Sequence, residues 1–198
     1  AVDIHELVKS LGYQKIDLVG HDIGLMVAYS YAAQFPAEVE KLALLEAPIP
    51  GIGDVWEKIF TNPALWHFHY VTSPIALELV KGRERIFLEH FWQSLSPHPE
   101  TFSEADRQLY AKSYAQEGAM RAAFEMFKNF NNQDAEDNRK LAINKLPMPV
   151  LTIEGDKAMG GALAIQAKLV ADNVQSITFT DTGHWLMEQR TTETKAEL

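Results

Sequence analysis

The stretch DLVGHDIG, residues 17–24, decides the fold of this chain. An apolar run leads into it, and a helical pattern follows it and ends before Pro36, where proline cannot continue a helix. Gly20 and Gly24 flank Asp22 in the order Gly-x-Asp-x-Gly. This order between a strand and a helix is typical of a sharp turn that exposes one nucleophile, with glycines where neighbouring backbone comes close on both sides. We therefore predict that Asp22 stands at the apex of a strand–turn–helix unit.

An aspartate at such an apex has a chemical use. Its carboxylate can attack an alkyl carbon and form an ester, which a serine hydroxyl does less readily. The backbone N–H of Ile23 would then face an oxyanion. The alternative interpretation is that Asp22 only caps the following helix, a role that aspartate often takes. The strand–turn–helix context favours the nucleophile.

Four short apolar runs have the length and composition of buried strands, and helical patterns follow the first and the third. Strand alternating with helix at this spacing predicts an α/β fold with a parallel sheet. The four expected strands are IDLV (16–19), KLALLE (41–46), MPVLTIEG (148–155) and QSITFTD (175–181).

A long insertion separates the second expected strand from the third. Residues 51–146 carry no strand pattern, are rich in aromatic residues and are helical in period. Within them Ser103, followed by acidic residues, predicts a helix N-terminus. We therefore predict a sheet core from residues 1–50 and 147–198, with 51–146 forming a helical lid.

Composition limits the possible partners. The chain has 198 residues, enough for one domain with a core, and its formal net charge of −9 argues against a nucleic acid or an acidic membrane as partner. The absence of cysteine excludes disulfides, a thiol nucleophile and thiolate metal ligands. We find no apolar run of membrane-spanning length, no signal-peptide pattern, no phosphate loop and no metal motif. No cofactor or metal is expected, and the compartment stays open.

His184 follows the fourth expected strand, in the sequence TGHW. Because parallel sheets assemble their sites at the carboxyl ends of strands, His184 could activate water to hydrolyse an ester on Asp22. An ordinary loop histidine is the alternative, and the chain order of nucleophile before histidine favours the base. Two acids at strand ends compete to orient this histidine, Glu46 and Asp156.

The order GHDIG, LLEAPIP, WHFHY and TGHW resembles the α/β-hydrolase fold family, in its branch of epoxide hydrolases and haloalkane or haloacetate dehalogenases. The resemblance covers nearly all of the chain and is strongest to bacterial epoxide hydrolases. It implies that Asp22 is the nucleophile, His184 the base and Glu46 the orienting acid. Much of the wider superfamily carries its acid at the position of Ala158, so Asp156, two residues earlier, is the reserve candidate.

The resemblance also implies lid residues that bind substrate. In similar epoxide hydrolases a histidine at the place of His67, together with a lid tyrosine, hydrogen-bonds the epoxide oxygen, and comparable lid groups hold the halide in haloacetate dehalogenases. The alternative is that His67 is only packed among lid aromatics, and His69 is expected to be structural. Phe127 stands where the tyrosine is expected, and a phenyl ring cannot donate a hydrogen bond. Another tyrosine could substitute: Tyr70, Tyr110 or Tyr114.

The predicted substrate is a small neutral organic molecule. Ile23 occupies the position where fluoroacetate-type relatives carry an arginine that holds a carboxylate, which disfavours a charged haloacid. The expected substrate-binding residues are His67, Trp66, Ile23, His21, Phe127 and Trp185.

The family's fold normally has several strands before the nucleophile, one of which ends in a loop that supplies a second oxyanion N–H. The resemblance therefore predicts that this chain corresponds to the portion of the fold from the nucleophile turn at residues 20–24 onward, with the N-terminal strands absent. A sheet of four strands would expose a long parallel edge that is prone to pairing. Two alternatives follow: copies of the chain associate through that edge, or the sequence is a portion of a longer chain.

Three functions follow. The first is a hydrolase that opens an epoxide through an Asp22 ester, and the second is a dehalogenase that uses the same three residues and releases halide. The third is a truncated, non-catalytic α/β-hydrolase-like domain that binds a small apolar ligand or pairs with another chain.

Overall fold

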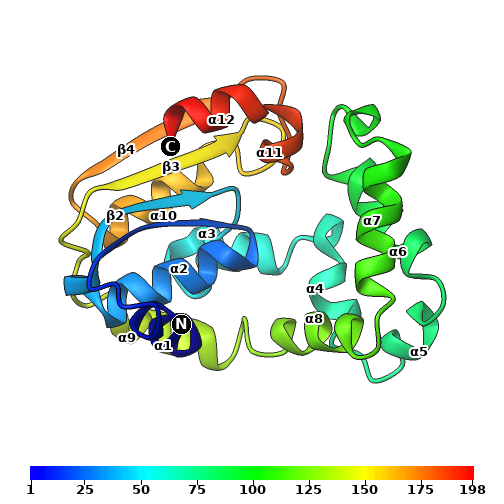
Figure 1. Cartoon of the computed structure of the whole chain (residues 1–198), viewed down its shortest axis with the longest axis horizontal. Helices are drawn as coiled ribbons and strands as arrows, with labels where there is room; N and C mark the ends of the chain where they lie inside the picture. The colour runs from blue at the N-terminus through cyan, green and yellow to red at the C-terminus, as the bar shows by residue number, and fades with distance from the viewer.

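The computed structural model describes residues 1–198 as a parallel sheet covered by helices, with a second layer of helices beside it (Figure 1). The sheet order is β1-β2-β3-β4, and every neighbouring pair is parallel. The strands are β1 (Ile16–His21), β2 (Val39–Leu45), β3 (Val150–Gly155) and β4 (Val174–Phe179). All four expected strands are confirmed, and the parallel α/β class with them.

The helices divide between the two layers. Those packed with the sheet are α1 (Val2–Ser10), α2 (Ile23–Gln34), α3 (Gly53–Phe60), α9 (Gln133–Leu141), α10 (Ala162–Val170), α11 (Leu186–Gln189) and α12 (Thr191–Glu197). Those of the second layer are α4 (His67–Tyr70), α5 (Ala76–Val80), α6 (Glu84–Ser94), α7 (Glu104–Tyr114) and α8 (Ala119–Phe127). Short 3-10 turns lie at Pro36–Glu38, Pro63–Leu65 and Pro99–Thr101.

The surroundings of strand β2 explain why its sequence is apolar at successive positions. Leu42 and Leu44 belong to the main core, which α2, α3 and α10 cover. Ala43 and Leu45 point to the opposite face and pack with α11. Because both faces of this central strand are covered, an alternating pattern is lost and a continuous run remains.

The insertion between β2 and β3 contributes to both layers. Its first helix, α3, contacts α10, and its last helix, α9, contacts α2, so both lie with the sheet. The helices α4–α8 between them form the separate layer, which we call the lid (Figure 1). At the start of α7 the Ser103 hydroxyl accepts from the Asp106 N–H while the Asp106 carboxylate accepts from the Ser103 N–H, so the expected helix start is confirmed.

Strand β1 lies at one edge of the sheet and pairs only with β2. Helix α1 precedes it and buries only His5 and Val8. The remaining apolar residues of that first segment are exposed: Val2, Ile4, Leu7 and Leu11. No helix in the structure combines the length and the apolar character needed to cross a membrane.

Candidate active site

The turn after β1 has the geometry that the sequence predicts. Asp22 lies between β1 and α2 with φ 54° and ψ −126°, a backbone conformation that few non-glycine residues adopt and that gathers at functional sites. A Cβ on Gly20 would lie 2.3 Å from the carbonyl oxygen of Gly24, so only glycine fits at position 20. A Cβ on Gly24 would meet nothing within 4 Å. The expectation that both glycines are needed is correct for Gly20 and wrong for Gly24, because the backbone of Gly24 lies against Gly20 while a Cβ on Gly24 would point into open space.

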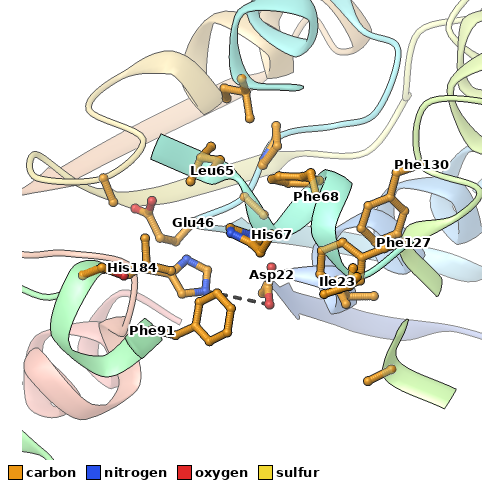
Figure 2. Close-up of a pocket in the computed structure, with 18 of the residues that line it drawn as sticks. Asp22, Ile23, Glu46, Leu65, His67, Phe68, Phe91, Phe127, Phe130 and His184 are labelled. Carbon is orange, nitrogen blue, oxygen red and sulfur yellow. Dashed lines mark ion pairs between the residues drawn. The ribbon is translucent and has the colours of Figure 1, made fainter. Parts of the chain in front are cut away.

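The loop after β4 brings His184 to Asp22. The Nε2 atom of His184 lies 3.8 Å from Oδ2 of Asp22, which is within ion-pair range and longer than a hydrogen bond (Figure 2). Half of the Asp22 side-chain surface is accessible, against 13% for His184. The backbone N–H of His184 donates to the carbonyl of Leu95 at 2.9 Å, so the segment after α6 holds this loop directly. Asp22 and His184, 162 positions apart along the chain, are thereby brought together as candidate nucleophile and base.

The two partners shift each other's protonation. Burial by itself would raise the pKa of the Asp22 carboxyl, but the adjacent His184 ring outweighs burial and holds this pKa below its usual value. Burial would likewise lower the pKa of His184, and the Asp22 carboxylate outweighs it and raises that pKa. Each partner therefore favours the charged form of the other, a carboxylate beside an imidazolium.

Glu46 lies directly after β2 with φ 46° and is fully buried. Its two carboxylate oxygens accept from the N–H groups of Gly155, at 2.5 Å, and Met159, at 2.8 Å, in the turn that follows β3. Burial raises the pKa of Glu46 to about 7, although these N–H groups and the charge of His184 act in the other direction. In return the Glu46 charge raises the pKa of His184. Glu46 is thus fixed in place and electrostatically coupled to the base.

Asp156, the reserve acid, makes different contacts. Its carboxylate accepts from the Thr182 N–H at 3.2 Å and pairs with the Lys157 ammonium at 3.3 Å. It is absent from the cavity wall described next, and the carboxylates that raise the pKa of His184 most are those of Asp22 and Glu46. The geometry therefore favours Glu46 over Asp156 as the acid that supports His184.

A cavity of about 440 Å³ lies between the sheet and the lid. Of its 31 lining residues 23 are hydrophobic, a character typical of sites for small organic ligands. Asp22, Glu46 and His184 all reach it from the sheet side. Asp22, Glu46 and His184 are thus gathered at the sheet end of an apolar chamber. Of the other titratable residues in its wall, His67 and Tyr114 belong to the lid and Lys157 pairs with Asp156.

Four of the six expected substrate-binding residues line this cavity: Ile23, His67, Phe127 and Trp185. Burial lowers the pKa of His67 to about 4, so its ring is neutral at pH 7 and can donate one N–H. Figure 2 shows this ring beside the Asp22 carboxylate, whose charge acts on it. The Phe127 ring lies 6.0 Å from the His67 ring, centroid to centroid, and supplies only apolar surface.

The other two, Trp66 and His21, do not line the cavity, and their assignment to it is wrong. Trp66 precedes α4 and points about a quarter-turn away from His67, because successive residues on a helix are ~100° apart. Its indole N–H donates to Nε2 of His90 at 3.1 Å. His21 is diverted to the His184 backbone, since its Nε2 lies 2.9 Å from that carbonyl oxygen.

The three candidate tyrosines have three different surroundings. Tyr114 lines the cavity, and burial together with the Asp22 charge raises the pKa of its phenol. The Tyr110 hydroxyl donates to the Glu188 carboxylate at 2.8 Å, outside the cavity. Tyr70 packs in a lid cluster with Val71. Tyr114 is therefore the tyrosine that faces the nucleophile's chamber.

The sequence argument missed the contribution of α6 to the cavity wall. The lining residues of this segment recur at helical spacing and share one face: Phe87, Leu88, Phe91, Trp92 and Leu95. The 3.6-residue period reveals such a face, but it does not say whether the face meets a core or a cavity.

Comparisons with known proteins agree with this architecture. The family described as alpha/beta hydrolase fold matches residues 1–191. The chain is 29% identical over 196 residues to a soluble epoxide hydrolase of Corynebacterium sp. (strain C12), covering 96% of this chain and 68% of that enzyme. The crystal structure of Cfl2 from Burkholderia cenocepacia is similar with a TM-score of 0.86 and 31% identity, covering 98% of this chain and 68% of that one.

A shorter match links the chain to a second chemistry. It is 34% identical over 76 residues to a fluoroacetate dehalogenase of Burkholderia sp., covering 37% of this chain and 24% of that enzyme. The chain thus spans about two thirds of the Corynebacterium and Burkholderia cenocepacia proteins and much less of this one. The family match extends over nearly the whole sequence, and the chain belongs to the α/β-hydrolase fold family, in its epoxide hydrolase branch.

Proposed function

We propose that this protein hydrolyses neutral epoxides through a covalent ester on Asp22. The observation that carries the proposal is the Asp22 carboxylate at a strained turn, 3.8 Å from the His184 ring and facing an apolar cavity. A serine at this apex would favour acyl transfer, whereas a carboxylate favours displacement at an alkyl carbon.

In the first step one oxygen of Asp22 attacks an epoxide carbon. A C–O ester bond forms and the ring C–O bond breaks, so the electron pair moves to the epoxide oxygen. That oxygen takes a proton from a lid donor, for which the neutral His67 N–H and the Tyr114 hydroxyl are the candidates. Positioning these donors where negative charge develops lowers the barrier to ring opening.

In the second step water cleaves the ester. His184 takes a proton from water, the hydroxide attacks Cγ of Asp22, and the N–H of Ile23, at the start of α2, faces the oxyanion. The ester C–O bond then breaks, and the leaving alkoxide oxygen takes the proton that the attacking hydroxide still carries, so the diol leaves and the Asp22 carboxylate is restored. The proton on His184 returns to the lid donor that gave its own away.

The electrostatics suit this order. The Asp22 carboxylate is the main cause that raises the pKa of His184. Esterification removes that negative charge, so the pKa of His184 falls and the ring becomes a free base when a base is needed. Glu46 remains to stabilise the imidazolium that forms as water is deprotonated.

Dehalogenation of a neutral haloalkane is the second candidate, supported by Phe127 and by the match to a fluoroacetate dehalogenase. A leaving halide needs no proton, so the missing hydroxyl at position 127 matters less for this reaction. Ile23, in place of an arginine, and the neutralised Lys157 argue against a carboxylate-bearing substrate for either reaction.

The test is intact-protein mass spectrometry of His184→Gln incubated with a panel of aryl and alkyl epoxides and bromoalkanes. An adduct equal to the whole epoxide mass, lost in Asp22→Asn/His184→Gln, supports epoxide opening. If bromoalkanes give an adduct with the mass of the alkyl group without halogen, and epoxides give no adduct, the result supports dehalogenation and contradicts epoxide hydrolysis. No adduct from folded protein contradicts both and leaves a non-catalytic domain.

A matched control is His69→Gln. His69 lies on the same lid helix as His67, and its Nε2 contacts the Phe60 carbonyl at 2.9 Å, outside the cavity. This variant retains the base, so it turns over without accumulating an ester.

A further inference from the structure

The histidine that precedes the nucleophile makes a contact across the site. His21 is the last residue of β1, and its Nε2 lies 2.9 Å from the carbonyl oxygen of His184. The two imidazole rings are 4.8 Å apart, centroid to centroid, and tilted by 36°. A carbonyl oxygen can only accept a hydrogen bond, so Nε2 of His21 carries the proton and donates it.

His21 serves as a neutral donor over the ordinary pH range. Burial lowers the pKa of His21 to about 4, and the nearby positive charge of His184 acts in the same direction while the Asp22 carboxylate opposes it. These two are the titratable groups that act on the ring. A second imidazolium beside His184 is therefore avoided, and the hydrogen bond to the carbonyl persists.

The backbone of His184 is held at both of its polar groups. Its N–H donates to the Leu95 carbonyl at 2.9 Å, and its carbonyl accepts from His21 and from the Leu186 N–H at 3.1 Å. The lid segment, the nucleophile strand and the helix after the loop thus all bind this one residue. Of these bonds only the one from His21 comes from the strand that carries Asp22.

We propose that His21 is a positioning residue that fixes the His184 ring relative to Asp22. The bond ties the base loop to the residue next to the nucleophile, so it sets the Asp22–His184 separation directly. This inference rests on the proposed function. It predicts different effects on the two steps of the reaction, ester formation and ester hydrolysis. Ester formation depends on Asp22 and the lid, whereas ester hydrolysis depends on the placement of His184.

Removal of the bond should therefore slow one step. In His21→Leu we expect ester hydrolysis to slow by roughly 10–10²-fold, since an ångström of misplacement costs rate on that scale, while ester formation changes by less than about threefold. In His21→Gln the side-chain amide N–H reaches nearly the position of Nε2, and most of the lost rate should return.

The experiment is single-turnover kinetics with acid quench and intact-mass detection, using an epoxide that gave an adduct with His184→Gln. Wild type, His21→Leu, His21→Gln and His69→Leu are compared after circular dichroism has established that each is folded. His69→Leu removes another histidine whose ring bonds a backbone carbonyl, that of Phe60, outside the cavity, and it should leave both steps unchanged. Equal slowing of both steps in His21→Leu, or no recovery in His21→Gln, contradicts the proposal.

A second measurement needs no turnover. Proton–nitrogen correlation NMR of ¹⁵N-histidine-labelled wild type should show His21 protonated at Nε2, and the opposite tautomer contradicts the proposal even if His21→Leu fails to fold. In a folded His21→Leu the pKa of His184, which faces Asp22, Glu46 and His67, should fall toward its ordinary value as the ring leaves Asp22. If no compound gives an adduct, the proposed function fails while these NMR results still decide the role of His21.

Discussion

The sheet side and the lid side of the cavity are built by different means. On the sheet side Asp22 and Glu46 follow strand ends in positive-φ conformations, and backbone N–H groups grip the Glu46 carboxylate. On the lid side aromatic rings pack edge to face, as Phe68 does with Phe127 at 5.6 Å. His67 lies among them as a neutral ring.

This difference separates reaction type from substrate choice. Charged groups need fixed partners, which a hydrogen-bonded sheet supplies, whereas apolar walls tolerate exchange of one hydrophobic side chain for another. We therefore expect changes on the sheet side to remove a chemical step and changes on the lid side to redistribute rates among substrates. Six variants, used in four tests, examine that division.

Asp22→Asn should have the largest effect. The amide keeps the shape of the side chain and tolerates positive φ, but it is a far weaker nucleophile, so adduct formation should fall by about 10⁴-fold or more. Single-turnover mass spectrometry measures the rate and also reveals any deamidation back to aspartate. Retained adduct formation in undeamidated protein would place the nucleophile elsewhere.

Glu46→Gln should come next. Loss of the carboxylate removes a charge that stabilises the His184 imidazolium, so ester hydrolysis should slow by about 10²–10³-fold while ester formation persists. In wild type the rate of hydrolysis should rise as pH passes through about 7, where Glu46 loses its proton. A variant with the same pH profile as wild type would exclude Glu46 as the titrating group.

The raised pKa of Glu46 also makes the stability of the fold depend on pH. Because its folded-state pKa lies above the unfolded value, neutral Glu46 stabilises the fold below pH 4.5, and this contribution is lost as pH rises through about 7. The melting temperature of wild type relative to Glu46→Gln should therefore decline over that window.

Gly20→Ala against Gly24→Ala tests the rigidity of the sheet side. The new methyl at position 20 would lie 2.3 Å from the Gly24 carbonyl oxygen, and relief of that clash should cost about 2–4 kcal/mol of unfolding free energy. At position 24 the methyl has open space, and the change should stay within about 1 kcal/mol. Urea unfolding of both variants measures the contrast, and equal destabilisation would refute the close approach at Gly20.

Tyr114→Phe against Tyr110→Phe tests the lid side and should have the smallest effect. Loss of a hydroxyl from the cavity should lower epoxide adduct formation by about tenfold and leave bromoalkane adducts nearly unchanged, since a halide needs no proton. The Tyr110 hydroxyl donates to Glu188 outside the cavity, so Tyr110→Phe should alter neither the epoxide nor the bromoalkane rate. Equal effects on both substrate classes would mean that Tyr114 shapes the cavity without donating.

The sequence alone determined the strands, the turn at Asp22 and the chain order of the three candidate residues Asp22, Glu46 and His184. Continuous apolar runs mark strands covered on both faces, and glycines around an acid mark a turn whose backbone leaves little room. These signals are local, because the hydrophobic period of an element and the residues of the turn that ends it lie within a short stretch of sequence. The same reasoning predicted the parallel sheet and a helical insertion between its second and third strands, but it assigned all of residues 51–146 to the lid, whereas α3 and α9 lie with the sheet.

Only the tertiary structure decided which polar side chains meet. It separated Tyr114 from Tyr70 and Tyr110, turned Trp66 away from the cavity and directed His21 to the His184 carbonyl. Side-chain direction depends on the rotation of short lid helices and on loops from distant strands, and sequence spacing carries no information on either. The positions of the candidate residues at the strand ends were therefore predictable from the sequence, while the shape of the cavity above them depends on packing.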